Sequence, residues 1–262
     1  MTAHRFLIVA LAAAATIAPA AARARSQDVP LVAAASSMNP ALEEIAAAFT
    51  RETGLRVELV FGASGTLTRQ IQGGAPFELL LSADEEYVAR LYASGHARDA
   101  GTLYAMGRLV LFARTGSPID PGAGLAALGL LLDAGRIDRF AIASPDLAPY
   151  GRAAEAALRA AGVWERITPR LVFGENVAQA ARFAVSGSAS GGLIPLSIAL
   201  TPAVSSHGTF AVLPDSLSHP VRQRMALLRN AGPAAVSFHD FVLGTTARDI
   251  LERHGFAVPG GS

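Results

Sequence analysis

Short apolar runs alternate with segments of helical periodicity, and this alternation restricts the fold more than any other feature of the sequence. Residues 29–35 form an apolar run, after which apolar residues recur at helical spacing until Gly54. Further strands are predicted at 56–61, 78–81, 103–114, 140–143, 171–173, 192–196, 210–213 and 221–228. Further helices are predicted at 65–72, 84–94, 152–161, 177–185 and 234–254. Strands that are followed by helices in this way predict α/β layers with a largely parallel sheet.

The length of the chain allows one large domain or two lobes, each able to bury its own core. A chain of 262 residues can supply two lobes of about 100 to 120 residues each. The run 103–114 is longer than the other strands and is a candidate to pass between the lobes, with 221–228 as the return. We expect a signal peptide at 1–24, a first lobe from 25–107 plus 222–262, and a second lobe from 108–221.

The first residues have the pattern of an export signal. Arg5 precedes an apolar run at 6–18, and the segment 20–24 offers A-x-A cleavage sites. That run is shorter than the roughly 20 residues that a membrane-spanning helix needs. We therefore expect cleavage after Ala22 or Ala24 and a location in the periplasm.

The composition excludes several classes of protein. The sequence contains no Cys, which removes disulfides, thiol catalysis and Cys-based zinc sites. Its 22 basic residues are all Arg, are scattered among 21 acids, and leave a net charge of +1. A nucleic-acid partner is not expected, because no basic patch or run is present. No pair of His residues has the spacing of a metal-binding helix motif, and no cofactor is expected.

Four loops that precede predicted helices share one chemical character. They are Ser36-Ser37, Ala63-Ser64-Gly65-Thr66, Pro149-Tyr150-Gly151 and Glu175-Asn176-Val177. Each places free backbone N–H groups at the start of a helix, where the helix dipole attracts anions. If the loops converge, they form an anion site without a cation. The alternative is that their Ser and Asn residues only cap helices, as any α/β protein requires.

Several stretches, taken in their order, identify a family. They are Ala34-Ala35-Ser36-Ser37, Phe61-Gly62-Ala63-Ser64-Gly65-Thr66-Leu67, Gly74-Ala75-Pro76, Leu81-Ser82-Ala83-Asp84, Ala148-Pro149-Tyr150-Gly151, Glu175-Asn176-Val177 and Arg253-His254-Gly255-Phe256. With this order and spacing, the chain from about residue 29 to residue 256 resembles the periplasmic molybdate-binding proteins of ABC transporters. Each tetrapeptide alone is weakly specific, and their order carries the resemblance.

The resemblance implies a two-lobed periplasmic-binding-protein fold of type II, with mixed sheets flanked by helices and a ligand cleft between the lobes. It implies capture of a tetrahedral oxyanion, molybdate or tungstate, by a monomer that delivers it to a membrane permease. By position, Ser37 and Ser64 would donate through hydroxyl and backbone, with Ser36 as a neighbouring donor. Tyr150 and Val177 would donate through backbone N–H. The metal of molybdate would be held only through its oxygens, by Ser37, Ser64, Tyr150 and Val177.

One position departs from the family pattern. Many members carry a Tyr hydroxyl donor where this sequence has Pro195, which offers neither a hydroxyl nor an N–H. Either the hydroxyl of Tyr150 or that of Ser197 compensates, or the choice of ligand has changed. Sulfate, phosphate and small organic anions therefore stay open as alternative ligands.

A second alternative is a secreted serine hydrolase. The segment Gly62-Ala63-Ser64-Gly65-Thr66 is similar to a nucleophile elbow, although that motif requires Gly where Thr66 stands.

Three acids lie close in sequence to the candidate loops, and we expect them to cap helices or face solvent: Asp84, Asp146 and Glu175.

Overall fold

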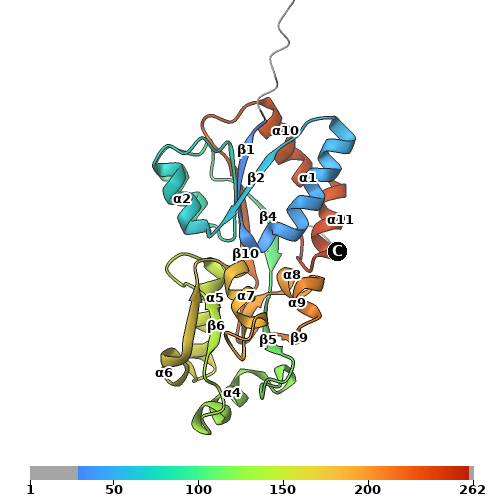
Figure 1. Ribbon diagram of the computed structural model, residues 1–262. Coiled ribbons are helices and arrows are strands. Elements are labelled where there is room, and N and C mark those ends of the chain that lie inside the picture. Colours follow the sequence, from blue (N-terminus) through green and yellow to red (C-terminus); the bar gives the residue numbers. More distant parts are fainter. Residues whose placement is uncertain (1–28, 260–262) are drawn as a thin grey trace, which may run out of the picture.

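The computed structural model describes residues 29–259, and the predicted signal peptide with its cleavage sites lies outside the described residues. Two five-stranded sheets form two bodies, one above the other, and helices cover each sheet (Figure 1). We call them the first and the second lobe. No helix within residues 29–259 is long and apolar enough to cross a membrane.

The strands are β1 (Leu31–Ala35), β2 (Glu58–Gly62), β3 (Leu79–Ser82), β4 (Thr102–Gly107), β5 (Leu109–Arg114), β6 (Phe140–Ala143), β7 (Leu171–Gly174), β8 (Gly191–Pro195), β9 (Gly208–Val212) and β10 (Val221–Leu227). The helices are η1 (Ser36–Met38), α1 (Asn39–Thr53), α2 (Ser64–Gln72), α3 (Glu86–Ala93), η2 (Pro121–Ala123), α4 (Gly124–Asp133), α5 (Pro149–Ala160), α6 (Trp164–Ile167), η3 (Thr168–Arg170), α7 (Val177–Val185), α8 (Leu196–Ala199), α9 (Pro202–Ser205), α10 (Pro233–Val242) and α11 (Thr245–Arg253).

The sheet of the first lobe has the strand order β2-β1-β3-β10-β4. Strand β1 is parallel to β2 and β3, whereas β10 is antiparallel to β3 and β4. Successive strand residues face opposite sides of a sheet. Val32 and Ala34 therefore join the core that α1, α10 and α11 cover, while Ala33 joins the core under α2 and α3. Burial on both faces explains why β1 is apolar throughout.

The sheet of the second lobe has the order β7-β6-β8-β5-β9. Strand β6 is parallel to β7 and β8, and β5 is antiparallel to β8 and β9. Helices α5 and α7 share one apolar core with these strands. Both sheets are thus mixed and flanked by helices. The alternation of strands and helices predicts parallel strand pairs only. It gives no signal for the antiparallel pairs, which β5 and β10 form after the chain crosses between the lobes.

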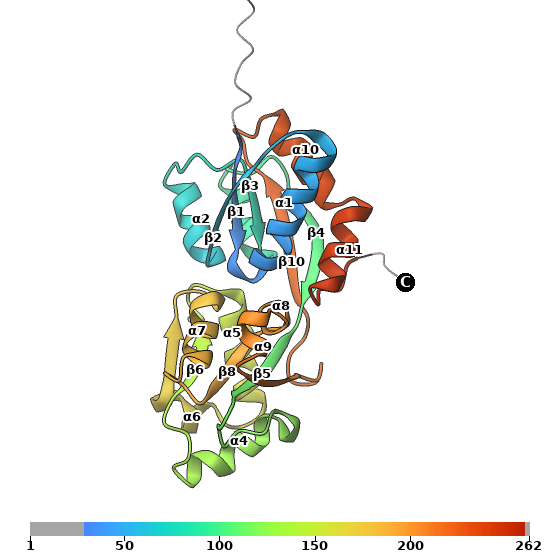
Figure 2. The ribbon, with the colours of Figure 1, turned by 45° about the vertical axis from the view of Figure 1, so that its right-hand side comes forward.

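The predicted strand at 103–114 is the crossing segment. It consists of two strands, β4 in the first sheet and β5 in the second, which are separated by Arg108 alone (Figure 2). Strand β10 then returns the chain to the first sheet. The boundaries 25–107 plus 222–262 and 108–221 stay a prediction, which these strand positions support.

Some local predictions are wrong. The helix expected at 234–254 is two helices, because Gly244 is extended (φ −76°, ψ 170°) and interrupts the helical backbone. The position of Asn39 before Pro40 predicts that it caps the first helix, but Asn39 lies inside α1, since η1 already begins the helical path. Helical spacing over 84–94 predicts that Tyr92 faces inward with Tyr87, yet Tyr92 is 51% exposed. Helix α4 has no counterpart in the prediction.

Candidate anion-binding site

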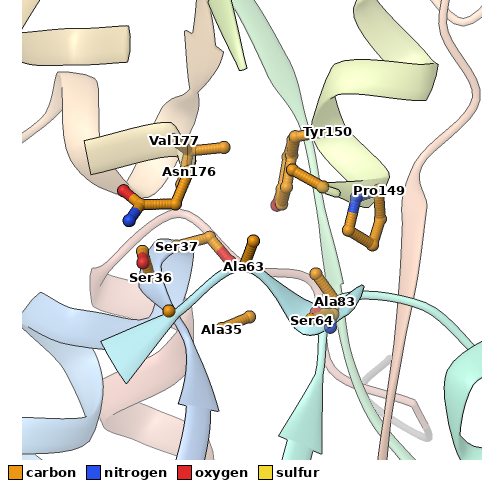
Figure 3. Close-up of a pocket in the computed structure, with 12 residues that line it drawn as sticks. Ala35, Ser36, Ser37, Ala63, Ser64, Ala83, Pro149, Tyr150, Asn176 and Val177 are labelled. Carbon is orange, nitrogen blue, oxygen red and sulfur yellow. Dashed lines mark hydrogen bonds between the residues drawn. The ribbon is translucent and has the colours of Figure 1, made fainter. Parts of the chain in front are cut away.

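The five residues predicted for the site line one cavity between the lobes (Figure 3). Ser36, Ser37 and Ser64 come from the first lobe, and Tyr150 and Val177 from the second. The cavity encloses about 190 Å³, including its opening. The other lining residues are small or uncharged: Ala35, Gly62, Ala63, Ala83, Ala148, Pro149 and Asn176.

Three helices begin at this cavity, and their first N–H groups are unused. Helix α2 begins at Ser64, α5 at Pro149 and α7 at Val177. Within the described part of the chain, the N–H groups of Ser64, Tyr150 and Val177 donate to no protein acceptor. They lack a partner because the first residues of a helix have no carbonyl one turn earlier. Three positive dipole ends therefore meet at one place.

Two buried hydroxyls add donors of a different kind. The side chain of Ser37 is fully buried, and within residues 29–259 its Oγ has no well-aligned hydrogen-bond partner. The Oγ of Ser64 accepts a hydrogen bond from the N–H of Ala83 over 3.0 Å, which leaves the Ser64 proton free. A buried hydroxyl without a partner is costly, so both protons are suited to a guest that carries acceptor oxygens.

None of the lining residues is charged. Asp84 does not line the cavity, and its Oδ1 accepts from the N–H of Tyr87 in the first turn of α3 over 3.1 Å. Asp146 is exposed. Glu175 lines a wider groove that adjoins the cavity along α2. The cavity therefore offers donors but no carboxylate, which would repel a dianion.

The two lobes touch each other beside the cavity. The N–H of Gly65 in α2 donates to the main-chain oxygen of Leu147 in the second lobe over 3.0 Å. Arg152 in α5 forms an ion pair with Asp84 and donates to the hydroxyl of Tyr87 over 3.2 Å. Burial raises the pKa of Asp84, and the hydrogen bond from Tyr87 and the charge of Arg152 oppose that rise. These contacts hold the first turns of α2 and α5 against each other.

The two hydroxyls that could compensate for Pro195, those of Tyr150 and Ser197, have different surroundings in the structure. Pro195 does not line the cavity. The hydroxyl of Ser197 is engaged elsewhere, because it donates to the main-chain oxygen of Ser37 over 2.8 Å. The hydroxyl end of Tyr150 points toward the first-lobe residues (Figure 3). Burial raises the pKa of Tyr150, an effect that the neighbouring side chains of Gln223 and Ser37 partly offset.

Two residues near the cavity were not predicted as part of the site. Asn176 lines it, and its Oδ1 caps α7 by accepting from Ala178 and Gln179 at 3.0 and 3.1 Å. In the sequence, the position of Asn176 directly before a predicted helix indicates that it caps this helix and lies close to the candidate donors. Gln223 contacts the hydroxyl of Tyr150 from β10. Nothing local in the sequence marks Gln223, because only the return of β10 brings it there.

The cavity does not have the groups of a serine hydrolase. Activation of Ser64 as a nucleophile requires a neighbouring base, and no His is among the lining residues. The Ser64 oxygen is also occupied by the N–H of Ala83. Nor do His, Asp and Glu residues within 29–259 gather in a group able to hold a metal cation.

Comparison with known proteins agrees with this geometry. The family model for bacterial extracellular solute-binding proteins matches residues 30–257. Molybdate-binding protein ModA of Azotobacter vinelandii is 34% identical over 257 residues, which cover 96% of this chain and 97% of the relative. Molybdate-binding protein ModA of Rhodobacter capsulatus is 33% identical over 229 residues, 86% of this chain and 87% of the relative.

A solved structure leads to the same family. The periplasmic molybdate-binding protein of Azotobacter vinelandii superposes with a TM-score of 0.77 at 29% identity, covering 88% of this chain and 99% of that chain. The type II two-lobed fold that the resemblance implied is therefore confirmed. The chain belongs to the bacterial extracellular solute-binding proteins and, among them, to the family of the molybdate-binding proteins.

Proposed function

We propose that this chain captures a tetrahedral oxyanion, molybdate, in the cavity between its lobes and delivers it to the permease of an ABC transporter. The observation that carries the proposal is the uncharged cavity at which three helices begin. The donors assigned to the anion are the N–H and hydroxyl of Ser37 and Ser64 and the N–H of Tyr150 and Val177, with Ser36 as a neighbour. Tungstate, which has the same shape and charge, is expected to bind as well.

The number of donors is sufficient for tight binding. Hydrogen bonds to a charged group contribute about 1.5 to 3 kcal/mol each, so six give roughly 9 to 18 kcal/mol. Association and ordering cost about 4 to 15 kcal/mol. The balance allows micromolar to nanomolar affinity, as a scavenging receptor requires.

The donor-only lining also selects among anions. Molybdate and sulfate without a proton present only acceptor oxygens, whereas hydrogen phosphate carries a proton that needs an acceptor. The cavity supplies no carboxylate for that proton. We therefore expect phosphate to bind much more weakly than molybdate.

Transport requires further steps that follow from the family. An extracellular solute-binding protein must leave the cytoplasm, and we propose export to the periplasm with cleavage after Ala22 or Ala24. We propose that a membrane permease recognises the lobes when they are closed on the anion, and that the protein acts as a monomer. Lobe closure is driven by contacts that form only in the closed state.

Isothermal titration calorimetry on the protein without residues 1–24 tests the function. Molybdate, tungstate, sulfate and phosphate are compared in separate titrations. We expect saturable binding of molybdate and tungstate at one site and much weaker binding of phosphate, while the titration with sulfate measures whether the cavity also selects by the size of the anion. Binding of phosphate alone would overturn the proposal.

A further inference from the structure

Three buried polar side chains connect the cavity to the strands that cross between the lobes. The hydroxyl of Tyr104 in β4 donates to Oε1 of Gln223 in β10 over 3.1 Å. The Nε2 of Gln223 donates to the hydroxyl oxygen of Tyr150 in α5, also over 3.1 Å. Tyr104 and Tyr150 are each 2% exposed, and Gln223 is fully buried.

The direction of these hydrogen bonds decides what the Tyr150 hydroxyl can do. A phenol has one proton to donate and lone pairs with which to accept. Because Gln223 donates to the oxygen of Tyr150, the proton of Tyr150 is not needed for that contact. In the described part of the chain, this proton has no protein acceptor, and Tyr150 lines the cavity.

A second unpartnered hydroxyl faces the same space. Among residues 29–259 the buried Oγ of Ser37 has no well-aligned hydrogen-bond partner, and it lies beside the Tyr150 hydroxyl, whose pKa it lowers. A buried hydroxyl proton without a well-aligned acceptor is unfavourable. A guest whose surface consists of acceptor oxygens would satisfy both hydroxyls at once.

Gly107 leaves room for the Tyr150 hydroxyl. This residue ends β4 at the crossing between the lobes, and a Cβ there would collide with the hydroxyl of Tyr150 and lie 2.9 Å from Nε2 of Gln223. A glycine at this position therefore leaves the space that the hydroxyl occupies.

We propose that the Tyr150 hydroxyl is a further donor to the bound oxyanion, and that Gln223 is the positioning residue that keeps its proton directed into the cavity. This inference rests on the proposed function. The family resemblance implies a backbone N–H from Tyr150, and this inference selects its hydroxyl, instead of that of Ser197, as the group that replaces the donor absent at Pro195. It also makes the affinity depend on β10, which contributes no lining residue to the cavity.

The test compares the affinity for molybdate by calorimetry in the wild type, Tyr150→Phe, Gln223→Met and the double variant. Tyr150→Phe keeps the backbone N–H, so its effect reports the hydroxyl alone. We expect the dissociation constant to rise about tenfold to a hundredfold in Tyr150→Phe and several-fold in Gln223→Met. In the double variant Gln223→Met should add little, because its effect passes through the Tyr150 hydroxyl.

A spectroscopic readout separates this role from a structural one. Molybdate should perturb the tyrosine ultraviolet spectrum of the wild type, and the perturbation should disappear in Tyr150→Phe. It should persist in the control Tyr104→Phe, since Tyr104 does not line the cavity. Gly107→Ala, which keeps every polar side chain but takes the space of the hydroxyl, should weaken binding in the same way as Tyr150→Phe.

The outcomes distinguish the two proposals. This inference is wrong if the wild type binds molybdate and both variants, Tyr150→Phe and Gly107→Ala, have dissociation constants within twofold of the wild-type value. The Tyr150 hydroxyl is then not a donor. If the melting temperature falls in these variants while the affinity is unchanged, the hydrogen-bond chain is structural only. If the wild type itself binds none of the four oxyanions, the proposed function fails and this inference with it.

Discussion

The hydroxyl of Ser197 in α8 donates to the main-chain oxygen of Ser37 in η1 over 2.8 Å, and both side chains are buried. The contact joins the second lobe to the first directly beside the cavity. Ser37 is thus held through its backbone, while its own hydroxyl has no well-aligned partner in the part of the chain that the structure describes. The backbone and the side chain of this residue consequently have separate roles, which mutation can distinguish.

Ser37→Ala is expected to weaken the binding of molybdate by about 1 to 3 kcal/mol without lowering the stability of the unliganded protein. No well-aligned hydrogen bond within residues 29–259 is lost, because the Ser37 hydroxyl makes none there. Calorimetry gives the affinity and thermal unfolding gives the stability. The matched variant Ser197→Ala should instead lower the melting temperature, since it removes the hydrogen bond between the lobes. Unchanged affinity in Ser37→Ala would exclude its hydroxyl from the site.

Ser64→Ala should differ from Ser37→Ala by reducing both affinity and stability. It removes a donor to the anion, and it also leaves the buried N–H of Ala83 without its acceptor. An unpaired buried N–H costs about 1 to 3 kcal/mol. Chemical denaturation without ligand measures this cost. Equal stability of Ser64→Ala and the wild type would contradict the assigned hydrogen bond.

Gly65→Ala is expected to impair closure of the lobes. A Cβ at Gly65 would lie 2.6 Å from the hydroxyl of Tyr87 and 2.9 Å from the main-chain oxygen of Leu147 across the cleft. The oxygen belongs to backbone and cannot move aside easily, so the affinity for molybdate should fall at least tenfold. Gly122→Ala is the control, because its Cβ would meet only the Asp120 side chain, at 3.3 Å, in the second lobe. Small-angle scattering with molybdate should find Gly65→Ala more open than the control.

Arg152→Gln should weaken binding by a factor of about two to five. Arg152 connects α5 to Asp84 and Tyr87 of the other lobe, so its loss destabilises the closed state relative to the open one. The effect is small because the Arg152 side chain is 38% exposed, and partly solvated ion pairs contribute about 0.2 to 1 kcal/mol. Arg166→Gln breaks a pair with Asp133 inside the second lobe and should leave the affinity unchanged. Equal affinities of the two variants would show that the Arg152 pair does not contribute to closure.

Stability should decrease as the pH rises above about 10. Burial raises the pKa of both Tyr104 and Tyr150 above the usual value for tyrosine, about 10. Above that pH the unfolded chain loses these protons while the folded chain keeps them, so unfolding becomes more favourable. Below pH 10 both states are protonated and these groups contribute no pH dependence.

Thermal unfolding between pH 8 and pH 11 measures this effect. The decline above pH 10 should be shallower in Tyr104→Phe, which removes one buried ionisable group. Tyr92→Phe is the matched control, since Tyr92 is 51% exposed, and it should retain the slope of the wild type. An identical slope in all three proteins would contradict the prediction.

The sequence alone determined most of the strands and longer helices in their order, and it determined the loops that carry donors. Helix α7 has the predicted bounds, 177–185, because its apolar stripe and its Asn176 cap are both local signals. The five predicted residues line one cavity because each lies at the start of a helix or beside one, and parallel strands place such starts at the same edge of a sheet.

Only the tertiary structure decided which distant groups meet. Gln223 and Tyr150 are 73 residues apart, and Ser197 and Ser37 are 160 apart. Their contacts depend on the antiparallel return of β10 and on the closure of the second lobe over the first, for which no short stretch of sequence carries a periodic signal. Periodicity reports which face of an element is buried, whereas the partner of a buried hydroxyl is set by how separate elements pack.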